Sequence, residues 1–199
     1  MATALQKQDF DKRRAALRER LCDPGFLTNK GLGNEAGIFI FCYDPTLENE
    51  VRQYFSRLKS DSQLGMLGSG DIRANIIEMN LYDVFIGICE CEDILEAAVE
   101  MEQEDGCDEL LDTLKSIASA DEFVSQMCYE PHNPGDVVLI TGVGEVYPFM
   151  RVHNILNGMQ SKFRDVPIVV AYPGTYDGGS LSLFGKLKDG NYYRAFDLV

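Results

Sequence analysis

Four short runs of mainly apolar residues alternate along the chain with longer segments of helical periodicity. The runs cover residues 37–43, 74–79, 136–141 and 166–172. The first, GIFIFCY, is apolar almost throughout, which is typical of a strand buried on both faces. Strands that alternate with helices favour a parallel sheet with crossover helices. The pattern therefore predicts an α/β fold with a mostly parallel, four- to five-stranded sheet flanked by helices.

One helix signal precedes the first predicted strand, and another follows each of the first three predicted strands. A helix is expected over about residues 7–22, and Asp44 with Pro45, Asn80 and Pro148 mark the starts of three more. The apolar positions of these segments recur every three or four residues. They are Phe10, Leu17 and Leu21; Leu47, Val51, Tyr54, Phe55 and Leu58; Leu81, Val84, Phe85 and Ile88; and Phe149, Val152, Leu156, Met159 and Phe163. The fourth set predicts that Phe149 is buried on a helix.

Three segments depart from this alternation. Residues 92–129 read as an insertion of two or three acidic helices, whose inward positions begin with Ile94, Leu95, Ala98 and Val99. The glycine-rich residues 60–71 predict a flexible loop. The tail, residues 180–196, predicts a C-terminal hairpin that turns at Asp189-Gly190. A chain of 199 residues can bury one sizeable core, so residues 1–199 are expected to form a single domain.

The negative charge is concentrated in one segment. Residues 78–130 carry 16 Asp or Glu against Lys115 alone, whereas the remaining residues carry 17 basic and 16 acidic groups. Outside residues 7–20 there is no basic run, so direct nucleic-acid binding is disfavoured. The acidic segment is either a solvated face or a docking surface for a basic partner. For the second reading, the candidate residues are Glu96, Glu100, Glu104 and Asp108.

Several classes of protein are excluded or disfavoured by what the chain lacks. The chain contains no uninterrupted run of 18 apolar residues, which a membrane-spanning helix would need. Its N-terminal stretch carries charges where a signal peptide needs an apolar core. A cytoplasmic location is therefore expected. The six cysteines contain no C-x-x-C pair, and only His132 and His153 could supply imidazole, so neither disulfides nor a zinc site are predicted.

Candidate chemistry is confined to the expected carboxyl ends of the strands, where ligands bind in open α/β sheets. Asp44, Asn80, Asp83, Glu145 and residues 173–177 are placed there, and their carboxylates could hold a divalent cation. Helix capping explains the first three equally well, and Glu145 is the least explained. The chain has no phosphate-binding loop and no G-x-S-x-G nucleophile motif. We therefore predict no catalytic, cofactor-binding or metal-binding residue and no cofactor.

A polar group follows the third strand. Glu145, Tyr147, Arg151 and His153 could mark a partner-binding patch, and the alternative is a salt bridge at the end of a helix. The surrounding string TGVGEVYPF, at residues 141–149, is long and specific. With NLYD at residues 80–83 and NYYRAF at residues 191–196, it resembles the BrxB family of bacterial BREX (bacteriophage exclusion) defence systems.

The resemblance runs from about residue 26 to the C-terminus. Residues 60–71 look longer than is usual in the family, and residues 89–103 are less familiar. The resemblance implies a small cytoplasmic component encoded with a methyltransferase, a large ATPase and the phosphatase-like PglZ. Such a component would serve a system that marks host DNA and blocks phage replication. No catalytic residues are established for the family, so none is carried over to this chain.

Three hypotheses follow from the sequence. The first is a non-catalytic adaptor of a BREX complex that binds a PglZ-like subunit and other subunits, and supports host DNA methylation and phage restriction. The second is a degenerate metal- or nucleotide-binding enzyme that uses the strand-end carboxylates. The third is a DNA-contacting subunit that uses the basic residues 7–20.

Overall fold

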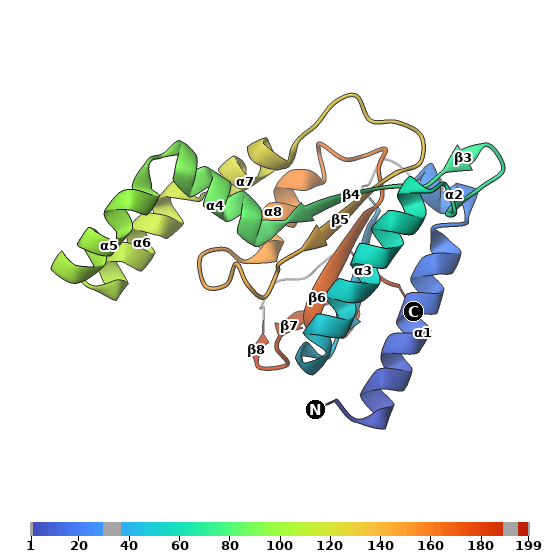
Figure 1. Ribbon diagram of the computed structural model, residues 1–199, viewed down its shortest axis with the longest axis horizontal. Coiled ribbons are helices and arrows are strands. Elements are labelled where there is room, and N and C mark those ends of the chain that lie inside the picture. Colours follow the sequence, from blue (N-terminus) through green and yellow to red (C-terminus); the bar gives the residue numbers. More distant parts are fainter. Residues whose placement is uncertain (1, 30–36, 189–194, 199) are drawn as a thin grey trace.

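The computed structural model describes residues 2–29, 37–188 and 195–198. Its central sheet has five parallel strands, in the order β4 (Asn75–Asn80), β5 (Asp136–Thr141), β6 (Ile168–Tyr176), β1 (Ile38–Tyr43) and β9 (Phe196–Asp197). Two short antiparallel strands, β7 (Leu181–Leu183) and β8 (Leu187–Lys188), extend the sheet from β6. The predicted α/β fold with a mostly parallel sheet is confirmed (Figure 1).

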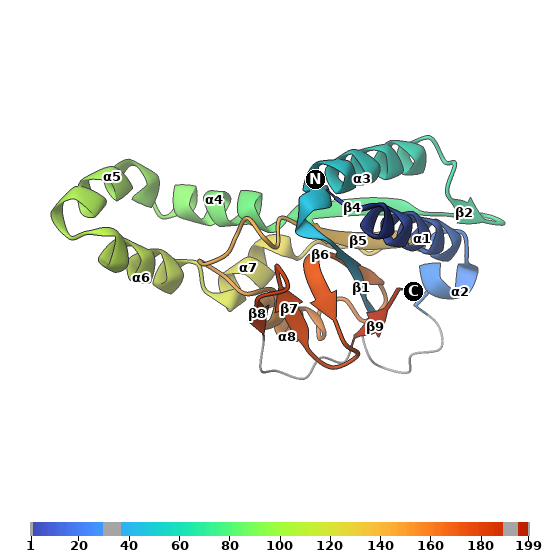
Figure 2. The same cartoon turned by 90° about the horizontal axis from the view of Figure 1, so that it is seen from below.

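Helices cover both faces of the sheet, because alternate side chains of each strand point to opposite sides. In β1, Phe39, Phe41 and Tyr43 belong to the core beneath α1 (Ala4–Arg20), α2 (Pro24–Leu27) and α3 (Glu48–Gln63). The intervening residues Ile38, Ile40 and Cys42 belong to the core on the opposite face. Residues of α4 (Leu81–Cys91), α7 (Ala120–Met127) and α8 (Val152–Met159) pack into that core, and Figure 2 shows α7 and α8 on that side of the sheet.

The segment predicted as a loop at residues 60–71 is partly helical. Helix α3 runs to Gln63, and the buried Ser62 hydroxyl donates to the Ala74 carbonyl at 2.6 Å and accepts from the Ile76 amide at 3.1 Å. The chain then forms a small hairpin from β2 (Gly68–Ser69) and β3 (Ile72–Arg73). The loop prediction was wrong for residues 60–63. The polar side chains there gave no apolar helical pattern, although the end of α3 is hydrogen-bonded to the segment that begins β4.

The C-terminal region contains a hairpin whose described turn comes earlier in the chain than Asp189-Gly190. Strand β6 continues past Pro173-Gly174 to Tyr176, and β7 and β8 are joined by a turn in which Phe184 and Gly185 have positive φ. Phe196, expected to pair within the hairpin, lies beside Phe39 of β1 instead. The predicted Asp189-Gly190 turn lies outside the described residues.

The acidic insertion between β4 and β5 forms three helices, as predicted. Two of them, α5 (Ile94–Glu104) and α6 (Cys107–Ile117), lie side by side and project away from the sheet (Figures 1 and 2). We call this pair the α5–α6 arm. The expectation that Leu95 and Val99 face inward was wrong: these side chains are 37% and 63% exposed, and α5 has no buried residue. The arm extends beyond the sheet, so α5 has little core to pack against.

Candidate functional site

The capping residues at the strand ends act as the simpler reading of the sequence suggested. The Asp44 carboxylate accepts from the Thr46 hydroxyl at 2.6 Å and from its amide at 2.9 Å, at the start of the short helix η1 (Pro45–Leu47). The hydrogen bond from the Thr46 side chain lowers the pKa of Asp44. Asn80 caps α4 by accepting from the amides of Tyr82 and Asp83 at 2.9 and 3.3 Å.

Glu145, which the sequence left least explained, is held by a cation. Arg52 of α3 forms an ion pair with Glu145 and a second one, at 3.0 Å, with Glu48. The Tyr43 hydroxyl, at the end of β1, donates to Glu48 at 2.7 Å. Burial raises the pKa of Tyr43, so this hydroxyl stays protonated as a donor. Glu145 therefore links the turn after β5 to helix α3.

A second cation lies further along the same helix. Lys59 pairs with Glu78 of β4 at 2.7 Å, and the Thr141 hydroxyl donates to Glu78 at 3.0 Å. Both ion pairs line a hollow of about 160 Å³. Asp44 lines a different cleft, and within the described ranges no three His, Cys, Asp or Glu side chains form a group that could hold a metal ion. The strand-end carboxylates thus form ion pairs and caps, and the metal-site reading gains no support from their arrangement.

The glycines of the TGVGE string are required by close packing. Gly142 has φ +72°, and a Cβ there would lie 2.3 Å from the Asn80 Oδ1 that caps α4. A Cβ on Gly144 would lie 3.0 Å from the Phe184 ring. The carbonyl of Gly142 also accepts from the amides of Glu145 and Val146 at 3.1 and 3.0 Å. The string therefore builds a tight turn that fits between a helix cap and the C-terminal hairpin.

The polar group after this turn is not on one helix. Helix α8 begins at Val152, so the predicted start at Pro148 was wrong. Phe149 precedes the helix and is half-buried, with its ring stacked on Phe85 at 4.4 Å between centroids. The Arg151 guanidinium lies 5.8 Å from the centre of the Tyr147 ring, an arrangement typical of a cation–π contact. Arg151 is exposed and His153 is half-buried.

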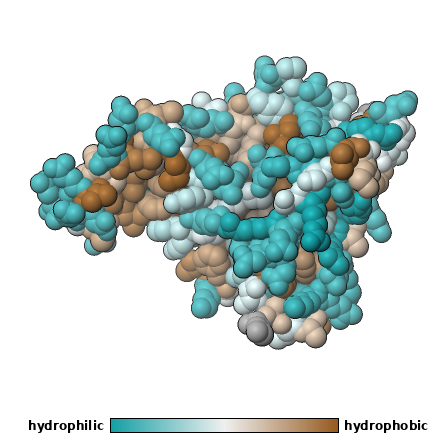
Figure 3. All heavy atoms as spheres, viewed as in Figure 1, coloured by the Kyte–Doolittle hydropathy of each residue, from teal (hydrophilic) through white to brown (hydrophobic). Residues whose placement is uncertain are grey.

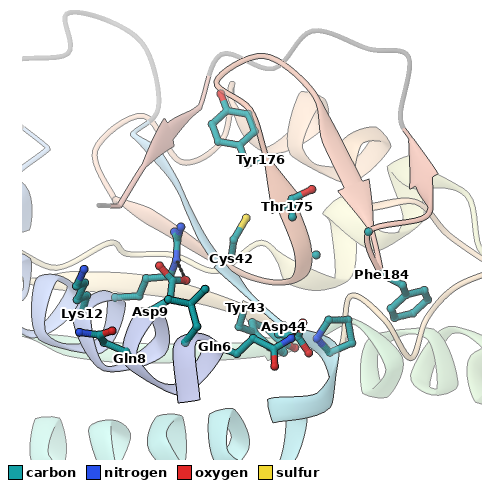
Figure 4. A pocket seen from close by; sticks show the side chains of 15 residues that line it. Gln6, Gln8, Asp9, Lys12, Cys42, Tyr43, Asp44, Thr175, Tyr176 and Phe184 are labelled. Carbon is teal, nitrogen blue, oxygen red and sulfur yellow. Dashed lines mark hydrogen bonds and ion pairs between the residues drawn. The ribbon is translucent and has the colours of Figure 1, made fainter. Parts of the chain in front are cut away.

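A cleft of about 530 Å³ lies between helix α1 and the carboxyl ends of β1 and β6. Figure 4 shows Gln8, Asp9 and Lys12 of α1 on one side, and Cys42, Thr175 and Tyr176 on the other. Burial raises the pKa of the Cys42 thiol to about 12, so this thiol is neutral. Asp44 and part of the predicted 173–177 segment do line the cleft. The sequence did not predict that residues of α1 line this cleft. The spacing of apolar residues in α1 indicates that the helix packs on the sheet, but it does not indicate which strand the helix lies beside.

The predicted acidic candidates are all on the α5–α6 arm. Glu96, Glu100, Glu104 and Asp108 are exposed, and the space-filling view shows apolar side chains gathered among polar ones over this arm (Figure 3). The arm candidates and the group from Glu145 to His153 are therefore placed on different elements. They do not form a single site.

Comparison with known proteins decides the family. The family model described as "BREX protein BrxB" matches residues 77–198. The chain is 41% identical over 187 residues to "BREX protein BrxB" of Bacillus cereus (strain H3081.97), covering 90% of this chain and 92% of that protein. The chain belongs to the BrxB family. A second BrxB relative, "BREX protein BrxB" of Escherichia coli O9:H4 (strain HS), is 30% identical over 195 residues, covering 96% of this chain and 92% of that protein. No solved structure matches the chain.

The BrxB match places the described surfaces in a BREX component. The family model begins within β4 and includes the α5–α6 arm, the TGVGE turn and the β6 side of the cleft. The two BrxB relatives extend the similarity over most of the remaining chain, where α1 and β1 lie. Among the described residues, no helix is long and apolar enough to cross a membrane.

Proposed function

We propose that this chain is a cytoplasmic, non-catalytic adaptor of a BREX defence system that binds a PglZ-like subunit and thereby supports host DNA methylation and phage restriction. The observation that carries the proposal is the α5–α6 arm. An element that leaves the core and exposes apolar side chains among carboxylates is typical of a surface that binds another protein. Family membership supports other BREX subunits as the partners.

The strand-end ion pairs support the non-catalytic part of the proposal. Glu145 is paired with Arg52, so its carboxylate has a structural role in joining the turn after β5 to α3. Replacing Glu145 by Gln is expected to leave the protein folded and to abolish no hydrolytic activity. Phosphatase, nuclease or ATPase turnover by the pure protein that disappears in E145Q would contradict the adaptor role.

Co-purification tests the adaptor role directly. Each BREX subunit of the same operon is expressed with a tagged copy of this chain, and the PglZ-like subunit is expected to be retained at a fixed stoichiometry. Tagged chain from which residues 94–117 have been replaced by a short linker serves as the comparison. Retention of no BREX subunit by the complete chain would refute the proposal.

The cleft favours a second candidate function, the binding of a small ligand. It lies outside the carboxyl ends of β1 and β6, where open α/β sheets bind ligands. Thermal melts with nucleotide and magnesium test this, because a ligand at 100 times its dissociation constant adds about 2.7 kcal/mol to stability. An unchanged melting temperature with each ligand leaves the adaptor as the better account of this fold.

A further inference from the structure

Helix α5 has a wider apolar face than the arm can cover. Ile94, Ala98 and Met101 follow helical spacing and are half-buried, whereas Leu95 and Val99 remain exposed beside them. Residues four apart lie on the same face of a helix, so Leu95 and Val99 form a short apolar strip about 6 Å long. We call this pair the α5 strip.

Carboxylates surround the α5 strip. Residues 90–114 contain 11 Asp or Glu and no Lys or Arg, and the one basic residue of the arm, Lys115, lies at the end of α6. Glu96 and Glu100 follow the two strip residues in sequence, one on each turn, and Glu102 lies one turn beyond Val99. The nearest cation in the sequence, Lys115, is 3.8 Å from Asp112 at the far end of α6. The strip is thus an apolar surface in a strongly negative field.

From this arrangement we infer that the α5 strip binds a basic amphipathic helix of a partner protein, whose apolar residues cover Leu95 and Val99 and whose Lys or Arg residues meet the surrounding carboxylates. The inference deepens the proposed adaptor role and rests on it, because it names the chemistry of the partner surface. A helical partner fits because the strip is straight and follows i, i+4 spacing, the pattern on which helices pack against each other.

A second copy of the chain is a poorer occupant than a basic partner. Two arms would bring their carboxylates together, which repel each other. Three of the four arginines in the basic run on α1 are engaged: Arg13 pairs with Asp9 and Asp197 at 2.9 Å, Arg14 with Asp11 at 3.0 Å, and Arg18 with Asp61 at 2.7 Å. These pairs leave a second copy with fewer available cations on α1 than its sequence suggests.

The size of the strip determines what kind of binding to expect. Two exposed apolar side chains bury little area, so the contact belongs with small, transient interfaces. Rim charges mainly speed association and make it dependent on ionic strength. Binding through the arm should therefore weaken steeply as salt is added.

The test uses the full chain and a defined probe. The probe is an 18-residue synthetic helix of Leu, Ala and Lys, labelled for fluorescence anisotropy, with a matched peptide in which every Lys is Glu. Two variants change the arm: L95S/V99S removes the strip, and E96Q/E100Q/E104Q/D108N removes four charges. The control E19Q/E50Q/D71N/E130Q makes the same change in net charge at exposed positions away from the arm. Circular dichroism checks that each variant is folded.

The lysine peptide is expected to bind the native chain, and the glutamate peptide is not. Each arm variant should weaken binding by about ten-fold or more, as should an increase from about 50 to 300 mM salt, while the control stays within about two-fold. A control that weakens binding as much as the arm variants would overturn the inference, since net charge alone would then explain the attraction. Binding unaffected by L95S/V99S would overturn it equally, and so would failure of the lysine peptide to bind.

Two further outcomes separate this inference from the adaptor role. Light scattering that shows dimers of the native chain but not of L95S/V99S would assign the strip to a second copy and overturn the inference. If BREX subunits co-purify equally with native chain and both arm variants, the adaptor role stands and the inference is wrong. If peptide binding depends on the arm but no BREX subunit co-purifies with the native chain, the adaptor role fails while the basic-helix preference of the strip holds.

Discussion

At the scale of single residues, the two glycines of the TGVGE turn lie so close to neighbouring atoms that a side chain would not fit. Gly142 allows the backbone to turn with positive φ directly beneath Asn80, which caps α4. An added Cβ would meet the capping oxygen and would also have to adopt the left-handed region, which costs about 1–2 kcal/mol. A side chain at Gly142 would therefore disturb both the turn and the start of α4, because it would displace the Asn80 Oδ1 that caps this helix.

Replacing Gly142 by Ala is expected to lower the free energy of unfolding by about 2–3 kcal/mol, since loss of the Asn80 cap adds about 1 kcal/mol to the backbone cost. Urea denaturation measures the change. Gly87 of α4 provides the matched control, because a Cβ there meets nothing within 4 Å and Gly-to-Ala exchange within a helix stabilises. A loss below about 1 kcal/mol for G142A would show that the turn can relax.

Phe149 provides a second test at this scale. Because it is half-buried and stacked on Phe85, Phe149→Ala should cost about 1–3 kcal/mol, less than the 3–5 kcal/mol typical of a fully buried aromatic. Phe85 is 3% exposed, so Phe85→Ala should reach that larger range. Equal losses for the two variants, measured by urea denaturation, would contradict the difference in burial.

The cysteines should differ in reactivity. A thiolate is the reacting species, and burial raises the pKa of Cys42 to about 12 and also raises the pKa of Cys89. At a pH near 8, both thiols stay protonated and should react with iodoacetamide much more slowly than the exposed Cys22, Cys91 and Cys128. Mass spectrometry over a time course checks the order. Early labelling of Cys42 would indicate that the cleft opens to solvent.

At the scale of elements, the arm and the sheet should differ in local stability. Helix α5 has no buried residue, whereas five of the six residues of β5 are buried. Segments with few buried contacts open at low free energy. Hydrogen exchange followed by mass spectrometry is expected to show peptides from residues 94–104 exchanging far faster than peptides from residues 136–141. Comparable protection would mean that the arm is stabilised by contacts outside the present structure, such as self-association.

The four main strands, β1, β4, β5 and β6, and the helix-capping residues could be predicted from the sequence because their signals are local. The continuous apolar run of β1 and the caps at Asp44 and Asn80 depend on neighbouring residues only. The pairing of Arg52 with Glu145 and the position of α1 along the cleft depend on which strands become neighbours, and no short-range pattern encodes that. The prediction that Leu95 and Val99 face inward was wrong for a different reason. Helical periodicity indicates that one face of a helix is apolar, but it does not indicate that the rest of the chain covers that face.

At the scale of the whole molecule, a net charge of −14 is a source of instability as well as solubility. Raising NaCl from about 20 to 300 mM shortens the screening length several-fold and should raise the melting temperature by about 2–4 °C, equivalent to about 1 kcal/mol for a chain of this size. Calorimetry measures the shift. The melting temperature of the variant E96Q/E100Q/E104Q/D108N should rise less with salt. An equal rise would show that the destabilising repulsion lies outside the arm.

The position of β1 has a consequence for the order in which the chain can fold during synthesis. Both neighbours of β1 in the sheet, β6 and β9, are made much later, since Ile38 pairs with Ile168 and Phe39 with Phe196. The ribosome adds about 5–20 residues each second, so the apolar segment IFIFCY must wait for several seconds with unpaired backbone edges. During that interval its unpaired edges can bind chaperones or pair with other chains and aggregate.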